Sequence, residues 1–185
     1  MAGRPHLTRW VAAFGLCFAG LASTLSAQGI SREEALASVY PGASIRAEQV
    51  FLTAAQLRQV AARAGNDTVP GLVARYLATR DGQLVGRAYI DTHTVRTKRE
   101  SLLVSLDTSG RVMRVDVTAF LEPPEYRAPE PWLGQYTGRG LDDSLTVNRA
   151  IRPIAGATLT TRAANSAIRR VLAIDETLRA TEDER

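Results

Sequence analysis

The sequence predicts an α+β fold, in which an antiparallel β-sheet is packed by helices within one domain. Four strand-like segments follow one another between residues 71 and 120. Short turn sequences such as Arg80-Asp81-Gly82 separate them, and such turns favour hairpins. Helical patterns lie only before and after this block. Strands joined in this way form an antiparallel meander, and a helix can cover one of its faces.

Two short helices and one strand are expected before the meander. Ser31 and Glu34 have the spacing of a capping box, which opens the first helix. Thr53 is placed to cap the second helix by accepting hydrogen bonds from its first N–H groups. The expected ranges are from Ser31 to the stop at Tyr40-Pro41-Gly42, a strand over residues 44–52, and a helix over residues 54–64 that Gly65-Asn66-Asp67 ends.

The meander is expected to contain strands over residues 71–79, 84–94, 101–106 and 111–120. In the last of them, Val112, Val115 and Val117 indicate a strand that is buried on one face. The alternation slips between Met113 and Arg114, which indicates a β-bulge.

A proline-rich connection follows the meander. Four prolines between Glu122 and Pro131 are expected to exclude regular structure there, and residues 132–136 to form a short helical turn. The last helix is expected from Arg162 to about Leu178, with Arg170 away from its apolar face. Residues 179–185 are expected to be a disordered tail, so residues 30–178 make up the domain.

Residues 1–27 have the pattern of a secretory signal. Arg4 and Arg9 precede an apolar stretch, and small residues follow it, with cleavage expected after Ala22 or Ala27. The run is also long enough to remain as a membrane anchor. We favour cleavage, because the run fades into Ser and Thr. In either case the domain is expected to be exported, in the periplasm or on the outer side of the cytoplasmic membrane.

Composition excludes several classes of function. Cys17 is the single cysteine and lies in the leader, so an internal disulfide or a cysteine metal site is excluded. The pI near 9.7 suggests a nucleic-acid partner, but the body without the leader has 21 basic and 19 acidic residues. Its only basic cluster is Arg96, Lys98 and Arg99, which is typical of a solvated turn. We therefore expect no nucleic-acid binding.

Residues 152–161 are the candidate functional stretch. Gly156 permits backbone angles that other residues resist, and its alanine neighbours add little bulk. Thr160 or Thr161 is expected to cap the helix that follows, and a helix start attracts phosphate. The stretch is therefore a candidate phosphate site, and Thr158 is expected to offer an exposed hydroxyl in its middle. A simple helix cap with a tight turn explains the same residues, and neither a Walker loop nor a dinucleotide fingerprint is present.

Gly156-Ala157-Thr158-Leu159-Thr160, with Ala155 before it, resembles the Ser/Ala-Gly-Ala-Thr motif of the FMN-binding domain family. That family includes the C subunit of the sodium-translocating NADH:quinone reductase and the G subunit of the Rnf electron-transport complex. The resemblance implies FMN joined through its phosphate to Thr158 by a separate flavin transferase, with Gly156, Ala157, Leu159, Thr160 and Thr161 around it. It also implies electron transfer to a membrane or periplasmic redox partner. Arg152 stands where the family often has Asp, a departure that concerns recognition by the transferase rather than phosphate binding.

Weaker matches to the family extend from Ser31 to Leu178. Among them, Asp91 and His93 lie two apart on a strand, hence on one face, and can bracket a ligand or simply face solvent. Tyr126 and Trp132 offer flat faces that can stack near a flavin or pack the proline-rich connection onto the sheet. Two rivals stay open: an accessory domain that holds FMN loosely or not at all, and a small secreted hydrolase that uses His93.

Overall fold

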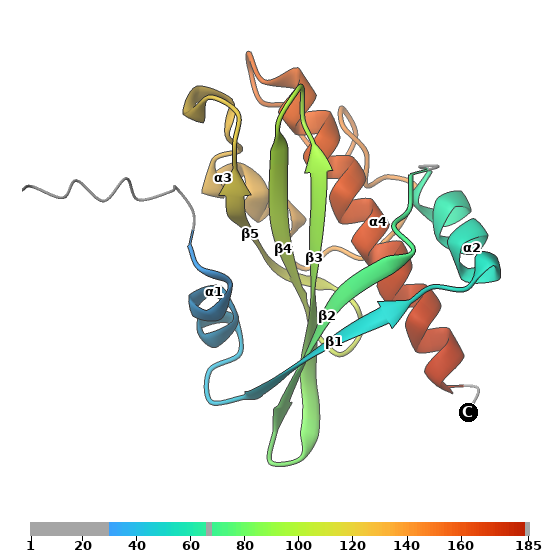
Figure 1. The fold of residues 1–185 in the computed structure, drawn as a ribbon. Helices are drawn as coiled ribbons and strands as arrows, with labels where there is room; N and C mark the ends of the chain where they lie inside the picture. The colour runs from blue at the N-terminus through green and yellow to red at the C-terminus, as the bar shows by residue number, and fades with distance from the viewer. Residues whose placement is uncertain (1–29, 66–67, 184–185) are drawn as a thin grey trace, which may run out of the picture.

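The computed structural model describes residues 30–65 and 68–183, so the predicted leader lies outside the described residues. Its centre is one antiparallel sheet of five strands that neighbour each other in chain order (Figure 1). This confirms the α+β class predicted from the meander. The strands are β1 (Ser44–Phe51), β2 (Leu72–Arg80), β3 (Gln83–Thr94), β4 (Arg99–Leu106) and β5 (Val112–Phe120).

Four α-helices surround the sheet: α1 (Arg32–Val39), α2 (Ala54–Ala64), α3 (Glu130–Leu133) and α4 (Thr158–Asp183). Both predicted caps are confirmed. Ser31 and Glu34 form a complete capping box on α1, and Thr53 forms one with Gln56 on α2. Short 3-10 turns occupy Pro124–Tyr126 and Gly134–Tyr136, so the proline-rich connection contains more regular structure than expected.

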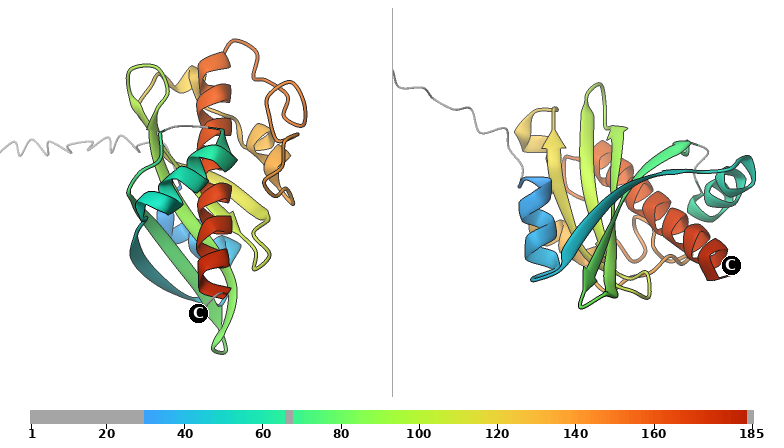
Figure 2. Two further views of the ribbon diagram at one scale, coloured as in Figure 1. Left: turned by 90° about the vertical axis from the view of Figure 1, so that its right-hand side faces the viewer. Right: turned by 60° about the horizontal axis from the view of Figure 1, so that its bottom comes forward.

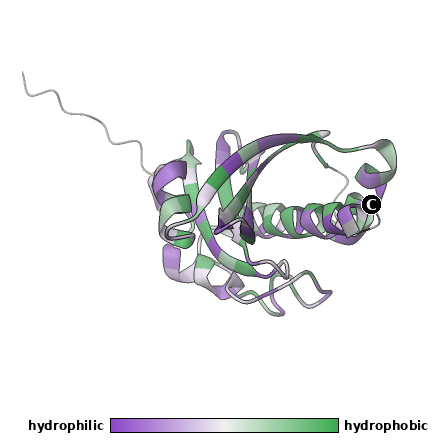
Figure 3. Ribbon diagram, turned by 90° about the horizontal axis from the view of Figure 1, so that it is seen from below, coloured by the Kyte–Doolittle hydropathy of each residue, from purple (hydrophilic) through white to green (hydrophobic). Residues whose placement is uncertain are grey.

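The two faces of the sheet support separate cores. On one face, α4 packs along the strands and α2 lies against α4 (Figure 2). This larger core joins Tyr89, Leu102 and Val104 of the sheet to Ile168 and Val171 of α4. On the other face, α1 covers a smaller cluster that includes Leu36, Tyr40, Tyr76 and Leu103. Hydrophobic and hydrophilic residues alternate along α4, as an amphipathic helix requires (Figure 3).

Strand register creates an opening at one end of the sheet. The pairing of β2 with β3 begins at Ala74 and Ile90, whereas β3 continues to Thr94 along β4. Residues 91–94 of β3 therefore pair with a strand on one edge only, within the described chain. At the other side of the sheet, Met113 is the extra residue opposite Ser105 and Leu106, which confirms the predicted bulge.

Helix α4 differs from its prediction at both ends. It begins at Thr158 rather than Arg162, so the prediction that Thr160 or Thr161 caps it is wrong. It continues to Asp183, so the expected tail is helical over residues 179–183. Contacts with the body explain this extension, since the Gln56 side chain of α2 donates to the Thr181 hydroxyl at 3.3 Å and Glu182 pairs with Arg75 of β2. No helix of the described residues is long and apolar enough to cross a membrane.

Candidate functional site

The Gly-Ala-Thr stretch forms a tight turn that leads directly into α4. The Ala157 N–H donates to the Ile154 carbonyl at 3.2 Å, and Gly156 has a φ of 75°. This left-handed angle is the one for which glycine is favoured, as the sequence suggested. A Cβ placed on Gly156 would meet no atom within 4 Å. Open space therefore lies beside the backbone of the turn.

The three threonines of this stretch have different environments. Thr160 and Thr161 are 1% and 0% exposed. The Thr160 hydroxyl donates to the Tyr126 carbonyl at 2.7 Å, and that of Thr161 donates to the Ala157 carbonyl and accepts from the Ile154 N–H. Thr158 is exposed, and its hydroxyl has no hydrogen-bond partner among the described residues. Only Thr158 thus presents a hydroxyl that a second molecule can reach.

The start of α4 also differs from the starts of the two capped helices. Side-chain oxygens accept from first-turn N–H groups in α1 and α2. Ala157, which precedes α4, has no side-chain acceptor. The first N–H groups of a helix have no partner within it, and the aligned peptide dipoles place partial positive charge there. This end of α4 therefore offers free donors beside the Thr158 hydroxyl.

Tyr126 and Trp132 hold the approach to this turn. The indole N–H of Trp132 donates to the Arg152 carbonyl at 2.6 Å, and the Arg152 N–H donates to the Gln135 side chain at 2.9 Å. Trp132 is 8% exposed and meets Tyr136 edge to face. Tyr126 contacts the start of α4 through its carbonyl, while the Arg96 guanidinium lies 5.0 Å from its ring centre. These contacts fix the proline-rich connection against α4.

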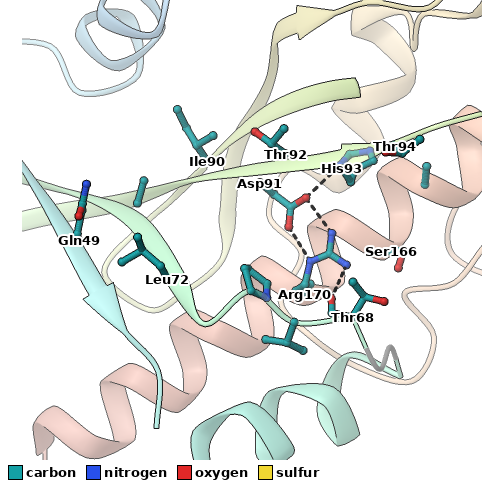
Figure 4. A pocket seen from close by; sticks show the side chains of 14 residues that line it. Gln49, Thr68, Leu72, Ile90, Asp91, Thr92, His93, Thr94, Ser166 and Arg170 are labelled. Carbon is teal, nitrogen blue, oxygen red and sulfur yellow. Dashed lines mark hydrogen bonds and ion pairs between the residues drawn. The ribbon is translucent and has the colours of Figure 1, made fainter. Parts of the chain in front are cut away.

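A cleft of about 790 Å³ opens where β2 leaves β3 (Figure 4). Its walls include Gln49, Leu72, Ile90 and Thr92 from the sheet, and Ala163, Ser166 and Arg170 from α4. The α4 residues share one stripe with Leu159, which is 47% exposed, because they follow it at helical spacing. Ser166 lies about 12 Å along the helix axis from Thr158, at 1.5 Å per residue. Thr158 precedes Leu159 by one residue, or about 100° around the helix, so the cleft follows the side of α4 next to Thr158.

A network of charged side chains forms one wall of the cleft (Figure 4). Arg170 donates to both carboxylate oxygens of Asp91, at 2.7 and 2.8 Å. The His93 ring lies between two carboxylates, with Nδ1 at 3.0 Å from Asp91 and Nε2 at 3.1 Å from Glu100. Asp91, Glu100 and Arg170 are 5%, 0% and 6% exposed. The arrangement joins β3, β4 and α4.

The two carboxylates keep His93 protonated. Burial alone would lower the pKa of His93, but hydrogen bonds and charges from Asp91 and Glu100 outweigh it and raise the pKa to about 9. Burial likewise disfavours ionised Asp91, yet His93 and Arg170 hold its pKa below the ordinary value. Both ring nitrogens of His93 are therefore donors at neutral pH, so it has no lone pair to act as a general base.

The structure brings together some of the candidates and separates others. Asp91 and His93 share the cleft wall, as their spacing suggested, whereas Tyr126 and Trp132 are absent from the cleft lining. The sequence did not identify Glu100 or Arg170, and Arg170 is buried against Asp91 instead of lying away from the packed side of α4. The spacing of Ala163, Ser166 and Arg170 could have indicated the cleft-facing side of α4, because it places two small residues and an arginine on one stripe.

No protein-family model, curated protein or solved structure matches this chain. The assignment of a function therefore depends on the geometry of the turn and the cleft and on the resemblance of the motif.

Proposed function

We propose that this domain is an exported electron carrier that holds FMN through its phosphate on Thr158, attached by a separate flavin transferase. The observation that carries the proposal is the placement of Thr158. It is the exposed threonine of the Gly-Ala-Thr turn, it stands at a helix start with free N–H donors, and a cleft lies further along that helix, on the stripe that begins at the neighbouring Leu159.

The residues of the chain fit such a group. First-turn N–H groups of α4 would receive the phosphate oxygens, and the open side of Gly156 leaves room for them. The cleft offers apolar surface from Leu72 and Ile90, and polar groups from Gln49 and Thr92. The unpaired edge of β3 over residues 91–94 adds backbone donors and acceptors for the polar edge of a flat ring.

Bound FMN would supply the one- and two-electron chemistry, and the protein would supply position and electrostatics. Thr158 has no neighbouring base, so an external transferase would form the phosphoester with FAD as donor and a divalent metal. The electron partner would be a membrane or periplasmic redox protein.

A second function is favoured by one feature, the exposed Arg152 six residues before Thr158. If the transferase does not accept arginine there, the same domain would act as an accessory protein that binds FMN loosely or not at all. Arg152 would still suit an anionic phosphate by its charge.

The test is expression of the full chain with a bacterial flavin transferase, followed by fluorescence of a denatured gel band and intact mass. We expect a fluorescent band that is heavier by one FMN less one water. Thr158→Ala should abolish both signals, and Thr108→Ala, an exposed threonine in the β4–β5 turn, should keep them.

Three outcomes contradict the proposal in different ways. Label that persists in Thr158→Ala would move the attachment to another residue. A dark band from protein that retains FMN through native gel filtration would favour loose binding. A dark band with no retained FMN would favour an accessory domain without flavin.

A further inference from the structure

We infer that the positive charge of His93 in the cleft wall favours the reduction of a bound flavin. In alkaline solution, where His93 is neutral, it takes up a proton when the flavin is reduced. This inference rests on the proposed function. It concerns the His93 side chain, which lines the cleft from β3 while its two ring nitrogens contact buried carboxylates.

The His93 side chain lies where it can contact a ligand of the cleft. It is 11% exposed, and it lies in the cleft wall together with Ala163 and Ser166 of α4. These α4 residues follow Leu159, the neighbour of Thr158, on the side of the helix that faces the cleft. A group tethered at Thr158 and laid along this stripe reaches the wall that contains His93.

The charges around His93 require it to be positively charged. Among the described residues, His93 forms ion pairs with Asp91 on its own strand and with Glu100 on β4, and Arg170 of α4 pairs with Asp91. Arg170 is matched by its two bonds to Asp91. Glu100 is fully buried, and one of its oxygens has no partner among the described residues. His93 is consequently the cation that compensates Glu100, since Arg96, Lys98 and Arg99 of the β3–β4 connection are exposed.

This balance predicts when a proton moves. Below pH 9, His93 already carries both ring protons, and its positive charge raises the reduction potential of a nearby flavin. Above pH 9, His93 loses one proton while the flavin is oxidised. Two electrons from an external reductant and one proton from solvent would then convert the flavin to its anionic reduced form, and a second proton from solvent would return to the ring nitrogen of His93. No other bond of the protein changes.

The test uses the full chain loaded with FMN by the transferase and reduced with dithionite, with the midpoint potential measured between pH 6 and pH 10.5. We expect His93→Gln to lower the potential at pH 7, and the gap to the native protein to close above pH 9. The native curve should steepen near pH 9, and the variant should lack that change. His93→Lys keeps a charge, and it should restore the potential at pH 7.

A second measurement, an NMR titration, uses the native protein and does not depend on whether a variant folds. His6 and His93 are the only histidines of the chain, so ring proton signals in NMR report His93 with little overlap. We expect a midpoint near pH 9 in the chain without flavin, and a higher midpoint in the reduced than in the oxidised loaded protein. Equal midpoints in the two redox states, or parallel potential curves for native and His93→Gln, would overturn the inference and leave flavin attachment standing. Failure of the chain to load FMN would overturn both the proposed flavin attachment and the inference about His93.

Discussion

Two buried ion clusters join α4 to β3, and they differ in what surrounds them. At the middle of the helix, Arg170 of α4 forms an ion pair with Asp91 of the strand. Nearer its end the polarity is reversed, because Asp175 of α4 accepts from Arg87 of the strand at 2.5 Å and from the Tyr89 hydroxyl at 2.9 Å. Arg179 completes the second cluster from the next turn of α4.

The Asp175 cluster is closed, whereas the Asp91 cluster forms part of a cleft wall. Arg87 is 3% exposed and also donates to the Thr108 carbonyl, so its hydrogen bonds are made within the protein. The Asp91 cluster adds His93, a side chain whose pKa of about 9 lets it lose its positive charge in alkaline solution. The ion pairs of the Asp175 cluster thus hold α4 against the sheet. Those of the Asp91 cluster place a titratable side chain, His93, in the wall of the cleft.

The largest effect is expected from Asp175→Asn. This change leaves the buried Arg87 without its anionic partner, and breaking a buried pair in this way costs about 3–5 kcal/mol. Urea unfolding followed by circular dichroism measures the loss. A cost below that of Asp91→Asn would show that the Asp175 cluster is not the closed one.

The next effect is a pH dependence that only the Asp91 cluster should produce. The pKa of His93 rises from 6.5 in the unfolded chain to about 9 in the fold, so its stabilisation is complete below pH 6.5 and is lost as the pH rises through 9. The difference corresponds to about 3 kcal/mol at 1.36 kcal/mol per pKa unit. The free energy of unfolding, measured by urea at pH 6, 7.5, 9 and 10, should fall in the native protein and remain flatter in His93→Gln. Equal slopes would contradict the ion pairing of His93.

Asp91→Asn should cost less than Asp175→Asn, about 1–3 kcal/mol. Asparagine still accepts one hydrogen bond from Arg170, and the adjacent cleft gives water access to this end of the network. The same urea assay at pH 7 compares the two variants. A larger loss of unfolding free energy than in Asp175→Asn would indicate that water in the cleft does not stabilise the unpaired charge of Arg170.

Sequence reasoning succeeded where the determining contacts are local. Hairpin turns, the capping box at Ser31 and the alternation that slips at Met113 all depend on residues close together in the chain. The pairing of Arg170 with Asp91 depends on how α4 crosses the sheet, and two residues 79 positions apart in the chain leave no local signal for it. The end of α4 was missed for a related reason, since Glu182 is held by Arg75 of a distant strand. Thr158 was identified from the local sequence as a candidate with an exposed hydroxyl, and the structure confirms that exposure.

The smallest effect is expected one residue beyond Asp175. Glu176 pairs with Arg63 of α2, but the two side chains are 43% and 51% exposed. Exposed pairs contribute about 0–1 kcal/mol, because water screens the charges and ordering two long side chains costs entropy. Glu176→Gln is therefore the matched control for Asp175→Asn, since both remove one carboxylate from adjacent positions of α4. If urea unfolding gave both variants the same cost, the loss of helix charge rather than the burial of Arg87 would explain the larger effect.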